Sequence, residues 1–182
     1  MKAVLDACVI YPSVLREILT GVAAQGLYEP VWSERILREW VLATAKLGPV
    51  VQMQAEGEAL RMRADFPRAM MRAQVDIEAR LLLPDAGDVH VLAVAVAAHA
   101  DCIVTFNARD FPRHVLAEEG IARRDPDSLL WELWSHHPEI VTGVVARVHA
   151  EAERLAGRVL ALKAFLKRAQ LPKLAKAMLA ES

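Results

Sequence analysis

The 182-residue chain carries 22 Lys and Arg against 23 Asp and Glu, so its formal net charge is −1 and it is no generic polyanion binder. Hydrophobic residues make up 54% of the chain and aromatic residues only 5%, which favours a helix-rich core of Ala, Val and Leu. A chain of this length can bury a core unaided and corresponds to about one domain with a helical extension. Cys8 and Cys102 are too few for a disulfide framework.

The charge is unevenly distributed along the chain. From Thr142 to Ser182 there are eight Lys and Arg and three Asp and Glu, whereas the first 141 residues hold 14 and 20. An acidic body with a basic C-terminal region fits a cation-binding core beside a surface for an anionic partner. A solvated helix face explains the basic region equally well.

No segment has the length of a membrane span. Met1-Lys2 is followed by only three apolar residues before Asp6, which is too short for the core of a signal peptide. The longest apolar run, Val91 to Ala98, falls well short of the roughly 20 residues that cross a bilayer. We therefore expect a soluble, cytoplasmic protein without membrane contact.

In the first third of the chain, apolar spacing predicts two strands, each followed by a helix. Residues 2–6 contain the apolar run Ala3-Val4-Leu5 without polar alternation, which is typical of a buried parallel strand. A helix is expected from Pro12 to about Gly26, and a second strand at 28–32. Ser33 suits the N-cap of a helix over 34–46.

The next part continues the alternation of strands and helices. Residues 50–80 look helical but less regular, and Pro67 divides them. The remaining expected elements are a buried helix at 88–98, a strand at 101–105, a short helix at 112–119 and an edge strand at 121–123. Such alternation predicts an α/β fold of Rossmann-like type, with a mainly parallel sheet flanked by helices.

Beyond Asp125-Pro126-Asp127-Ser128 the pattern is helical throughout, with no strand signal. Apolar residues step alternately by four and three positions along Val141, Val145, Val148, Ala152, Leu155, Val159, Leu162 and Leu166. This apolar stripe is typical of a helix that packs against another helix, and Pro172 stops it. The predicted division is therefore a domain at 1–125 and an all-helical C-terminal extension at 126–182.

Three carboxylates occupy positions where an α/β fold places ligands. Asp6 ends the first strand and Asp110 follows the third, so both lie at the carboxyl ends of the strands if the sheet is parallel. Asp88 begins a helix, and its ordinary role would be an N-cap worth about 1 kcal/mol. Together with Asp6 and Asp110, a metal ligand becomes the favoured interpretation of Asp88.

The fourth acid is not settled by spacing. Glu39, Glu34 and Glu17 all lie on predicted helices, where a solvated residue is the ordinary role of an acid. Asp85 is either a turn former or a supporting acid. Asp101 lies at the opposite end of its strand and is expected to be structural.

Neutral groups and the absence of soft ligands narrow the chemistry. Thr105 and Asn107 offer oxygens that can orient a carboxylate or a water. His90 is expected to be a packed or polar-bonded histidine that points away from Asp88, and no Cys/His cluster of zinc type exists in the sequence. Clustered carboxylates repel one another unless a cation is present or some are protonated. Oxygen ligands alone would select Mg²⁺ or Mn²⁺, which supports phosphodiester hydrolysis.

With these acids in this order, the chain resembles the PIN-domain nucleases, and especially the VapC-type toxin ribonucleases of bacteria. The matching stretches frame residues 1 to about 125, and it is the four in order that are specific. They are Val4-Leu5-Asp6-Ala7-Cys8-Val9-Ile10, Trp32-Ser33-Glu34-Arg35-Ile36-Leu37-Arg38-Glu39, Pro84-Asp85-Ala86-Gly87-Asp88-Val89-His90-Val91-Leu92-Ala93 and Val104-Thr105-Phe106-Asn107-Ala108-Arg109-Asp110-Phe111.

The resemblance implies a PIN-like fold and Mg²⁺- or Mn²⁺-dependent endonucleolytic cleavage of RNA, with homodimers and a small antitoxin that blocks the site. It selects Glu39 over Glu34. The residues that carry over as catalytic and metal-binding are Asp6, Glu39, Asp88 and Asp110, with Thr105, Asn107 and Asp85 in support. Two features depart from the family: Gly87, where relatives often look more acidic, and the extra helical region from about Asp127.

Our leading hypothesis is a toxin ribonuclease in which a metal-activated water hydrolyses a phosphodiester of single-stranded RNA. The alternative is a catalytically silent PIN-like interaction module that assembles through its C-terminal helices. A phospho-receiver domain is disfavoured, because Asp6 lacks an adjacent acid and no Lys follows the third strand. A small-molecule phosphatase would use similar chemistry.

Overall fold

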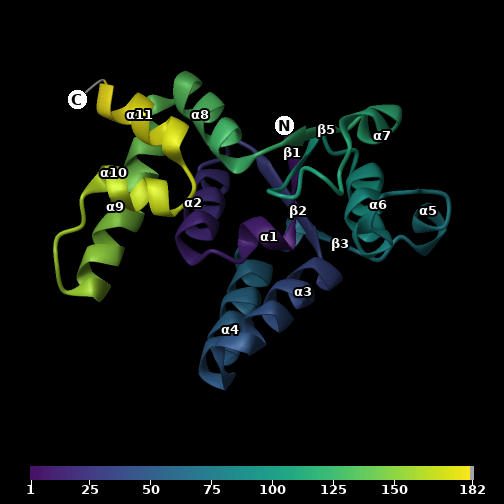
Figure 1. Cartoon of the computed structure of the whole chain (residues 1–182), viewed down its shortest axis with the longest axis horizontal. Coiled ribbons are helices and arrows are strands. Elements are labelled where there is room, and N and C mark those ends of the chain that lie inside the picture. Colours follow the sequence, from purple (N-terminus) through teal and green to yellow (C-terminus); the bar gives the residue numbers. More distant parts are fainter. Residues whose placement is uncertain (181–182) are drawn as a thin grey trace. The chain divides into compact units, whose positions relative to one another are not determined.

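The computed structural model describes residues 1–180, which form two compact units (Figure 1). The first unit comprises Met1–Tyr11 and Tyr28–Arg124. The second comprises Pro12–Leu27 and the chain from Asp125 onward, so it takes one helix from near the N-terminus. None of the helices in the described part of the chain is long and apolar enough to cross a membrane.

The first unit is built on a five-stranded sheet in the order β3-β2-β1-β4-β5, with every neighbouring pair parallel. The strands are β1 (Lys2–Leu5), β2 (Glu29–Ser33), β3 (Met70–Met71), β4 (Cys102–Val104) and β5 (Ala122–Arg124). Ala3 in β1 pairs with Pro30 on one side and Cys102 on the other, so β1 is central. The predicted α/β fold with a parallel sheet is confirmed. The two-residue β3 has no strand signal in the sequence.

Helices and short 3₁₀ turns connect the strands of this sheet. They are α1 (Ala7–Ile10), α3 (Glu34–Thr44), α4 (Pro49–Asp65), α5 (Val75–Glu78), α6 (Val89–Ala98) and α7 (Arg113–Glu118), with 3₁₀ turns η1 (Ala45–Leu47), η2 (Pro67–Ala69) and η3 (Ala86–Asp88). The Oγ of Ser33 accepts a hydrogen bond from Ile36 N at 3.3 Å, which makes Ser33 the predicted N-cap of α3. Helix α6 packs against β1, β2 and β4, which explains its almost wholly apolar sequence.

The second unit is entirely helical within the described residues. It consists of α2 (Ser13–Ala24), α8 (Pro126–His136), α9 (Pro138–Ala156), α10 (Leu162–Arg168) and α11 (Pro172–Ala180). Asp125 caps α8 by accepting a hydrogen bond from Ser128 N at 2.9 Å. Helix α2 packs against α9 where Gly21 faces Val144, and a Cβ at residue 21 would lie 2.8 Å from Val144 Cγ1. Gly21 therefore permits a close helix approach, at some loss of helix propensity.

The apolar stripe from Val141 to Leu166 does not lie on one continuous helix. Gly157 takes φ 63°, a left-handed conformation that ends α9, and five residues separate α9 from α10. Val141 is fully buried, whereas Leu155 and Val159 are 71% and 87% exposed. The predicted stripe is therefore interrupted: Val145 and Val148 are buried in α9 and Leu166 is buried in α10, whereas Leu155 and Val159 between them are exposed.

Candidate metal centre

Asp6 directly follows β1, and its carboxylate is held from one side. Its backbone N–H donates to Val104 O at 3.1 Å, which continues the pairing of β1 with β4. The Thr105 hydroxyl donates to Asp6 Oδ2 at 2.7 Å, and the Cys8 thiol donates to the same oxygen at 3.0 Å. Burial and the charge of Asp6 raise the pKa of Cys8 to about 12, so the thiol stays a donor. Both bonds fall on Oδ2, which leaves Oδ1 available.

Asp88 occupies the N-cap position of α6, but its side chain makes no capping hydrogen bond. The carboxylate is therefore not used in the ordinary role of a helix cap. Burial raises the pKa of Asp88 to about 6, assisted by the negative charges of Asp6, Asp85, Asp110 and Glu39. All the predicted acids thus lie close enough to Asp88 to act on its ionisation.

Asn107 connects the acids that follow β4 and η3. Its Nδ2 group donates to Asp110 Oδ2 at 2.6 Å and lies 3.4 Å from Asp88 Oδ2. Its backbone N–H donates to Thr105 Oγ1 at 2.9 Å, and this hydroxyl in turn donates to Asp6. One chain of hydrogen bonds therefore orients three of the predicted acids.

Arg123 in β5 fixes the loop that carries Asp110. Its Nη1 group donates to the carbonyl oxygens of Ala108 at 2.5 Å and Phe111 at 2.9 Å. Phe111 is fully buried, so the residue after Asp110 is held by packing as well. The position of Asp110 is thus determined by the sheet.

Glu39 lies in α3 and is held by two basic side chains. His90 is 2% exposed, and its Nε2 lies 3.0 Å from Glu39 Oε1. Arg35 Nε donates to the same oxygen at 3.1 Å, and Arg35 Nη2 donates to Gly87 O at 3.2 Å. Burial by itself raises the pKa of Glu39, but His90 and Arg35 outweigh it and lower the pKa below its usual value. Glu39 is thereby kept ionised and tied to the loop that precedes Asp88.

Three carboxylates are close enough to share an ion. One oxygen from each of Asp85, Asp88 and Asp110 lies within 4.8 Å of the others. Asp85, predicted only as a supporting residue, therefore belongs to the closest acidic group in the described chain. Its Oδ1 also accepts a hydrogen bond from Gly87 N at 2.7 Å, and a Cβ at residue 87 would lie 3.0 Å from that oxygen. The close approach of Asp85 Oδ1 leaves little room for a side chain at residue 87.

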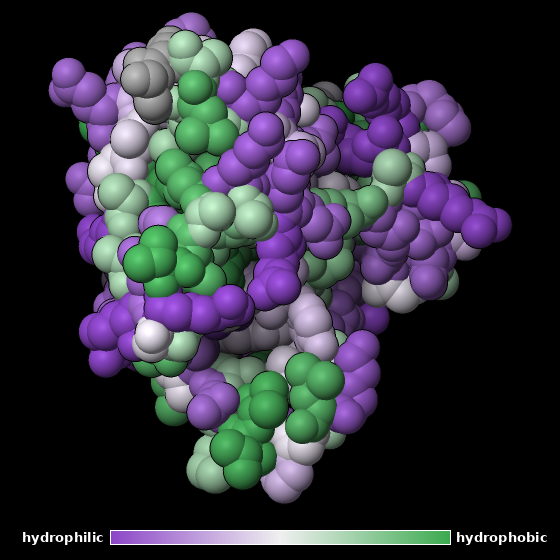
Figure 2. All heavy atoms as spheres, turned by 60° about the vertical axis from the view of Figure 1, so that its left-hand side comes forward, coloured by the Kyte–Doolittle hydropathy of each residue, from purple (hydrophilic) through white to green (hydrophobic). Residues whose placement is uncertain are grey.

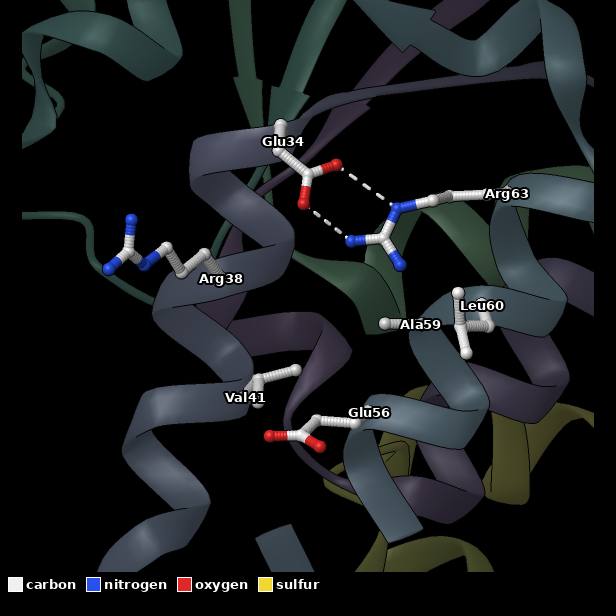
Figure 3. Close-up of a pocket in the computed structure, with 7 residues that line it drawn as sticks. All are labelled: Glu34, Arg38, Val41, Glu56, Ala59, Leu60 and Arg63. Atoms are coloured by element: carbon white, nitrogen blue, oxygen red, sulfur yellow. Dashed lines mark hydrogen bonds and ion pairs between the residues drawn. The ribbon is translucent and has the colours of Figure 1, made fainter. Parts of the chain in front are cut away.

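The other acids considered from the sequence make contacts elsewhere or lie outside the first unit. Glu34 forms two hydrogen bonds to Arg63, at 2.6 and 3.0 Å, in a pocket between α3 and α4 (Figure 3). Glu17 lies in α2, which belongs to the second unit. Asp101 accepts a hydrogen bond from Lys2 N at 2.6 Å, a structural contact as expected.

Sequence reasoning missed Cys8, Arg35 and Arg123, and it gave His90 no role at the site. Cys8 lies two residues after Asp6 and could have been suspected from that spacing. Arg35 precedes Glu39 by four residues, a spacing that favours an ion pair on a helix. Arg123 acts through main-chain carbonyls 12 and 15 residues earlier, and no sequence pattern marks such contacts.

A protein-family model described as PIN domain matches residues 2–109, more than half of the chain. The chain belongs to the PIN-domain family. Searches of curated proteins and of solved structures gave no match. The matched range contains Asp6, Glu39 and Asp88 and ends one residue before Asp110. PIN domains are generally nucleases that use divalent metals, and the acidic triad of this PIN domain could bind one.

Proposed function

We propose that this PIN-domain protein is a Mg²⁺- or Mn²⁺-dependent endoribonuclease, with Asp6, Glu39, Asp88 and Asp110 as its catalytic and metal-binding residues. One observation carries the proposal. The charges of the other acids act together with burial to raise the pKa of Asp88 to about 6. The electrostatic repulsion between such carboxylates decreases when a cation binds between them.

The donor set fits a hard divalent cation. Asp85, Asp88 and Asp110 offer carboxylate oxygens at mutual distances below 4.8 Å, and Asp6 keeps Oδ1 available. The thiol of Cys8 is protonated and bonded to Asp6, so it does not compete as a soft ligand. When bound, Mg²⁺ or Mn²⁺ activates water and neutralises charge on a phosphate.

The chain's own residues would orient the reacting groups. Thr105 and Cys8 hold Asp6, while Asn107 holds Asp110 and faces Asp88. His90 and Arg35 lower the pKa of Glu39, so its carboxylate would be ionised and able to contribute negative charge to a cation site. The resemblance to toxin ribonucleases supports single-stranded RNA as the substrate. The continuous apolar stripe behind the alternative of a silent interaction module is not formed.

The test is cleavage of labelled single-stranded RNA with Mg²⁺ or Mn²⁺, compared with EDTA. Asp88→Asn should lower the rate at least about 100-fold, because it removes a carboxylate from the centre. Glu34→Gln is the matched control, since Glu34 lies on the same helix as Glu39 but is paired with Arg63. Equal activity of wild type and Asp88→Asn, or cleavage that persists in EDTA, would refute the assignment.

A toxin role with a small protein antitoxin, a homodimer and a cytoplasmic location are further parts of the proposal. Large apolar side chains lie exposed along α3, η1 and α4, and Figure 2 shows hydrophobic colour at the end of the molecule where these helices turn. They are Leu42, Leu47, Val50, Met53 and Leu60. Exposed apolar groups of this kind favour a protein partner.

Expression in a bacterial host tests the toxin role. Wild type should arrest growth and Asp88→Asn should not, and co-expression of a small protein encoded beside the gene should restore growth. Antitoxin binding should protect amides of α3 and α4 from hydrogen exchange. Growth unaffected by the wild type would remove the toxin role but not the nuclease activity.

A further inference from the structure

The second unit carries a basic surface that the nuclease centre does not use. From Gly157 to Ala180 the sequence has six basic and no acidic residues, and all six are exposed. The Lys173 ammonium lies 3.6 Å from the Trp131 ring centroid. The other five, Arg158, Lys163, Lys167, Arg168 and Lys176, form no ion pair within residues 1–180.

A pocket of about 240 Å³ opens on this basic surface. Arg158 and Arg168 contribute its charged groups, and the rest of its lining is apolar. The apolar lining residues are Val159, Leu160, Ala161, Ala164 and Phe165. Figure 2, which brings the side of α9, α10 and α11 forward, shows hydrophobic residues exposed between strongly hydrophilic ones.

The 157–161 loop that forms one wall of the pocket is held in place by α9. Leu160 N donates to Glu153 Oε1 at 2.8 Å, and Leu160 O bonds to His149 Nε2 at 2.7 Å. The Phe165 ring meets the His149 ring edge-on at 4.9 Å between centroids. Val159 nevertheless stays 87% exposed. A loop fixed on both sides of its residue 160, with an exposed apolar tip, is preorganised for a ligand.

We propose that this pocket binds single-stranded RNA, with a base against its apolar wall and flanking phosphates on Arg158 and Arg168. A single strand presents flat bases beside regularly spaced negative charges, and proteins bind it through cationic grooves with planar or apolar surfaces. Arginine suits both contacts, because its guanidinium pairs with phosphate and stacks on bases. The choice of RNA rests on the proposed function, whereas the pocket itself is independent of the metal centre.

The test is binding of a fluorescent 12-nucleotide RNA to the full chain in EDTA, measured by anisotropy over a range of salt. Arg158→Gln/Arg168→Gln should weaken binding about 10- to 100-fold and reduce the salt slope by about 1 to 2. Val159→Ser, which keeps the charge, should weaken binding by roughly 3- to 10-fold. Arg61→Gln/Arg154→Gln is the matched control, because both arginines are already paired with glutamates on their own helices.

Equal weakening by the two double variants would reduce the effect to net charge and overturn the pocket, as would unchanged binding by Arg158→Gln/Arg168→Gln. Displacement of RNA by polyphosphate or polyglutamate at equal charge would also overturn it. Hydrolysis of bis(4-nitrophenyl) phosphate with Mn²⁺ tests the metal centre separately. It should be unchanged in Arg158→Gln/Arg168→Gln, and its absence in the wild type would count against the proposed nuclease without touching the binding result.

Discussion

Asp88 is the acid of the site whose pKa is raised most clearly by burial and by its neighbours. Its carboxylate is half-buried, makes no capping hydrogen bond to α6, and is repelled by the negative charges of four other acids. The folded protein therefore binds a proton at Asp88 more tightly than the unfolded chain does, because the pKa rises from 3.8 to about 6. The contribution of Asp88 to stability falls as pH rises from about 4 to 6 and stays low above that.

In the absence of metal, Asp88→Asn should stabilise the protein at pH 7 and have little effect at pH 4. The gain at pH 7 should be on the order of 1 kcal/mol after allowance for solvent screening, or a rise in Tm of about 2–4 °C. Thermal unfolding in EDTA at both pH values measures it. If Asp88→Asn is less stable than wild type at pH 7, the negative charges around Asp88 do not repel its carboxylate as proposed.

Thr105 links two parts of the site, because its hydroxyl accepts a hydrogen bond from the backbone N–H of Asn107 and donates one to Asp6. Thr105→Val keeps the volume but removes this link, and should lower metal-dependent activity about 10- to 100-fold. Thr105→Ser should retain most of the activity. Equal losses in the two variants would assign the effect to packing.

The sequence pattern identifies the acids of the site but not the side chains that hold them in place. Strand ends and helix starts point to Asp6, Asp88 and Asp110, because a parallel sheet brings such positions to one edge. Glu39 could be distinguished from the other glutamates only by the family resemblance. Its contacts with His90 and Arg35 mark it as part of the site, but His90 is brought to it by the fold. Asp85 looked secondary, and only the closed turn at Gly87 places it beside Asp88 and Asp110.

Among the elements, α9 differs most from its prediction. Apolar spacing continues past residue 157, but the helix does not, because Gly157 adopts a left-handed conformation. Spacing alone cannot distinguish a helix-ending glycine from one tolerated inside a helix, such as Gly143. The loop thus formed carries the pocket proposed for RNA.

Two glycines of the α2–α9 pair give an opposing pair of predictions. Gly21→Ala should destabilise the protein by about 1–2 kcal/mol, since its Cβ would lie 2.8 Å from Val144 Cγ1. Gly143→Ala should stabilise it by about 0.5–1 kcal/mol, because nothing lies within 4 Å and helix propensity improves. Urea unfolding measures both, and equal signs would contradict the close approach at Gly21.

The whole molecule is not divided in the order of its sequence. Unit 2 contains α2 from residues 13–24 together with α8 to α11, so the chain enters it, leaves it and returns. The predicted domains, 1–125 and 126–182, assign α2 to the first domain by sequence continuity. Nothing in its apolar stripe says which later helix it contacts, because that partner lies more than 100 residues away.

A chain cut after Arg124 tests this division. It keeps α2 but loses α9, the helix that α2 packs against, so apolar side chains of α2 that α9 covers would be exposed, at about 1.5–3 kcal/mol for each one that is fully uncovered. We expect a lower Tm and self-association in size-exclusion chromatography. Addition of residues 125–182 as a separate polypeptide should reverse both. A fragment that melts cooperatively at the full-chain temperature would instead support 1–125 as an independent domain.

The split course of the chain also has a consequence on the ribosome. Helix α2 is synthesised early, but its partner α9 begins only at Pro138. At about 5–20 residues per second, the interval between them lasts roughly 6 to 23 s. During that time α2 lacks its packing partner α9, so the apolar side chains that α9 later covers are exposed to solvent. We expect the nascent chain to be a substrate for a chaperone bound near the ribosomal exit tunnel.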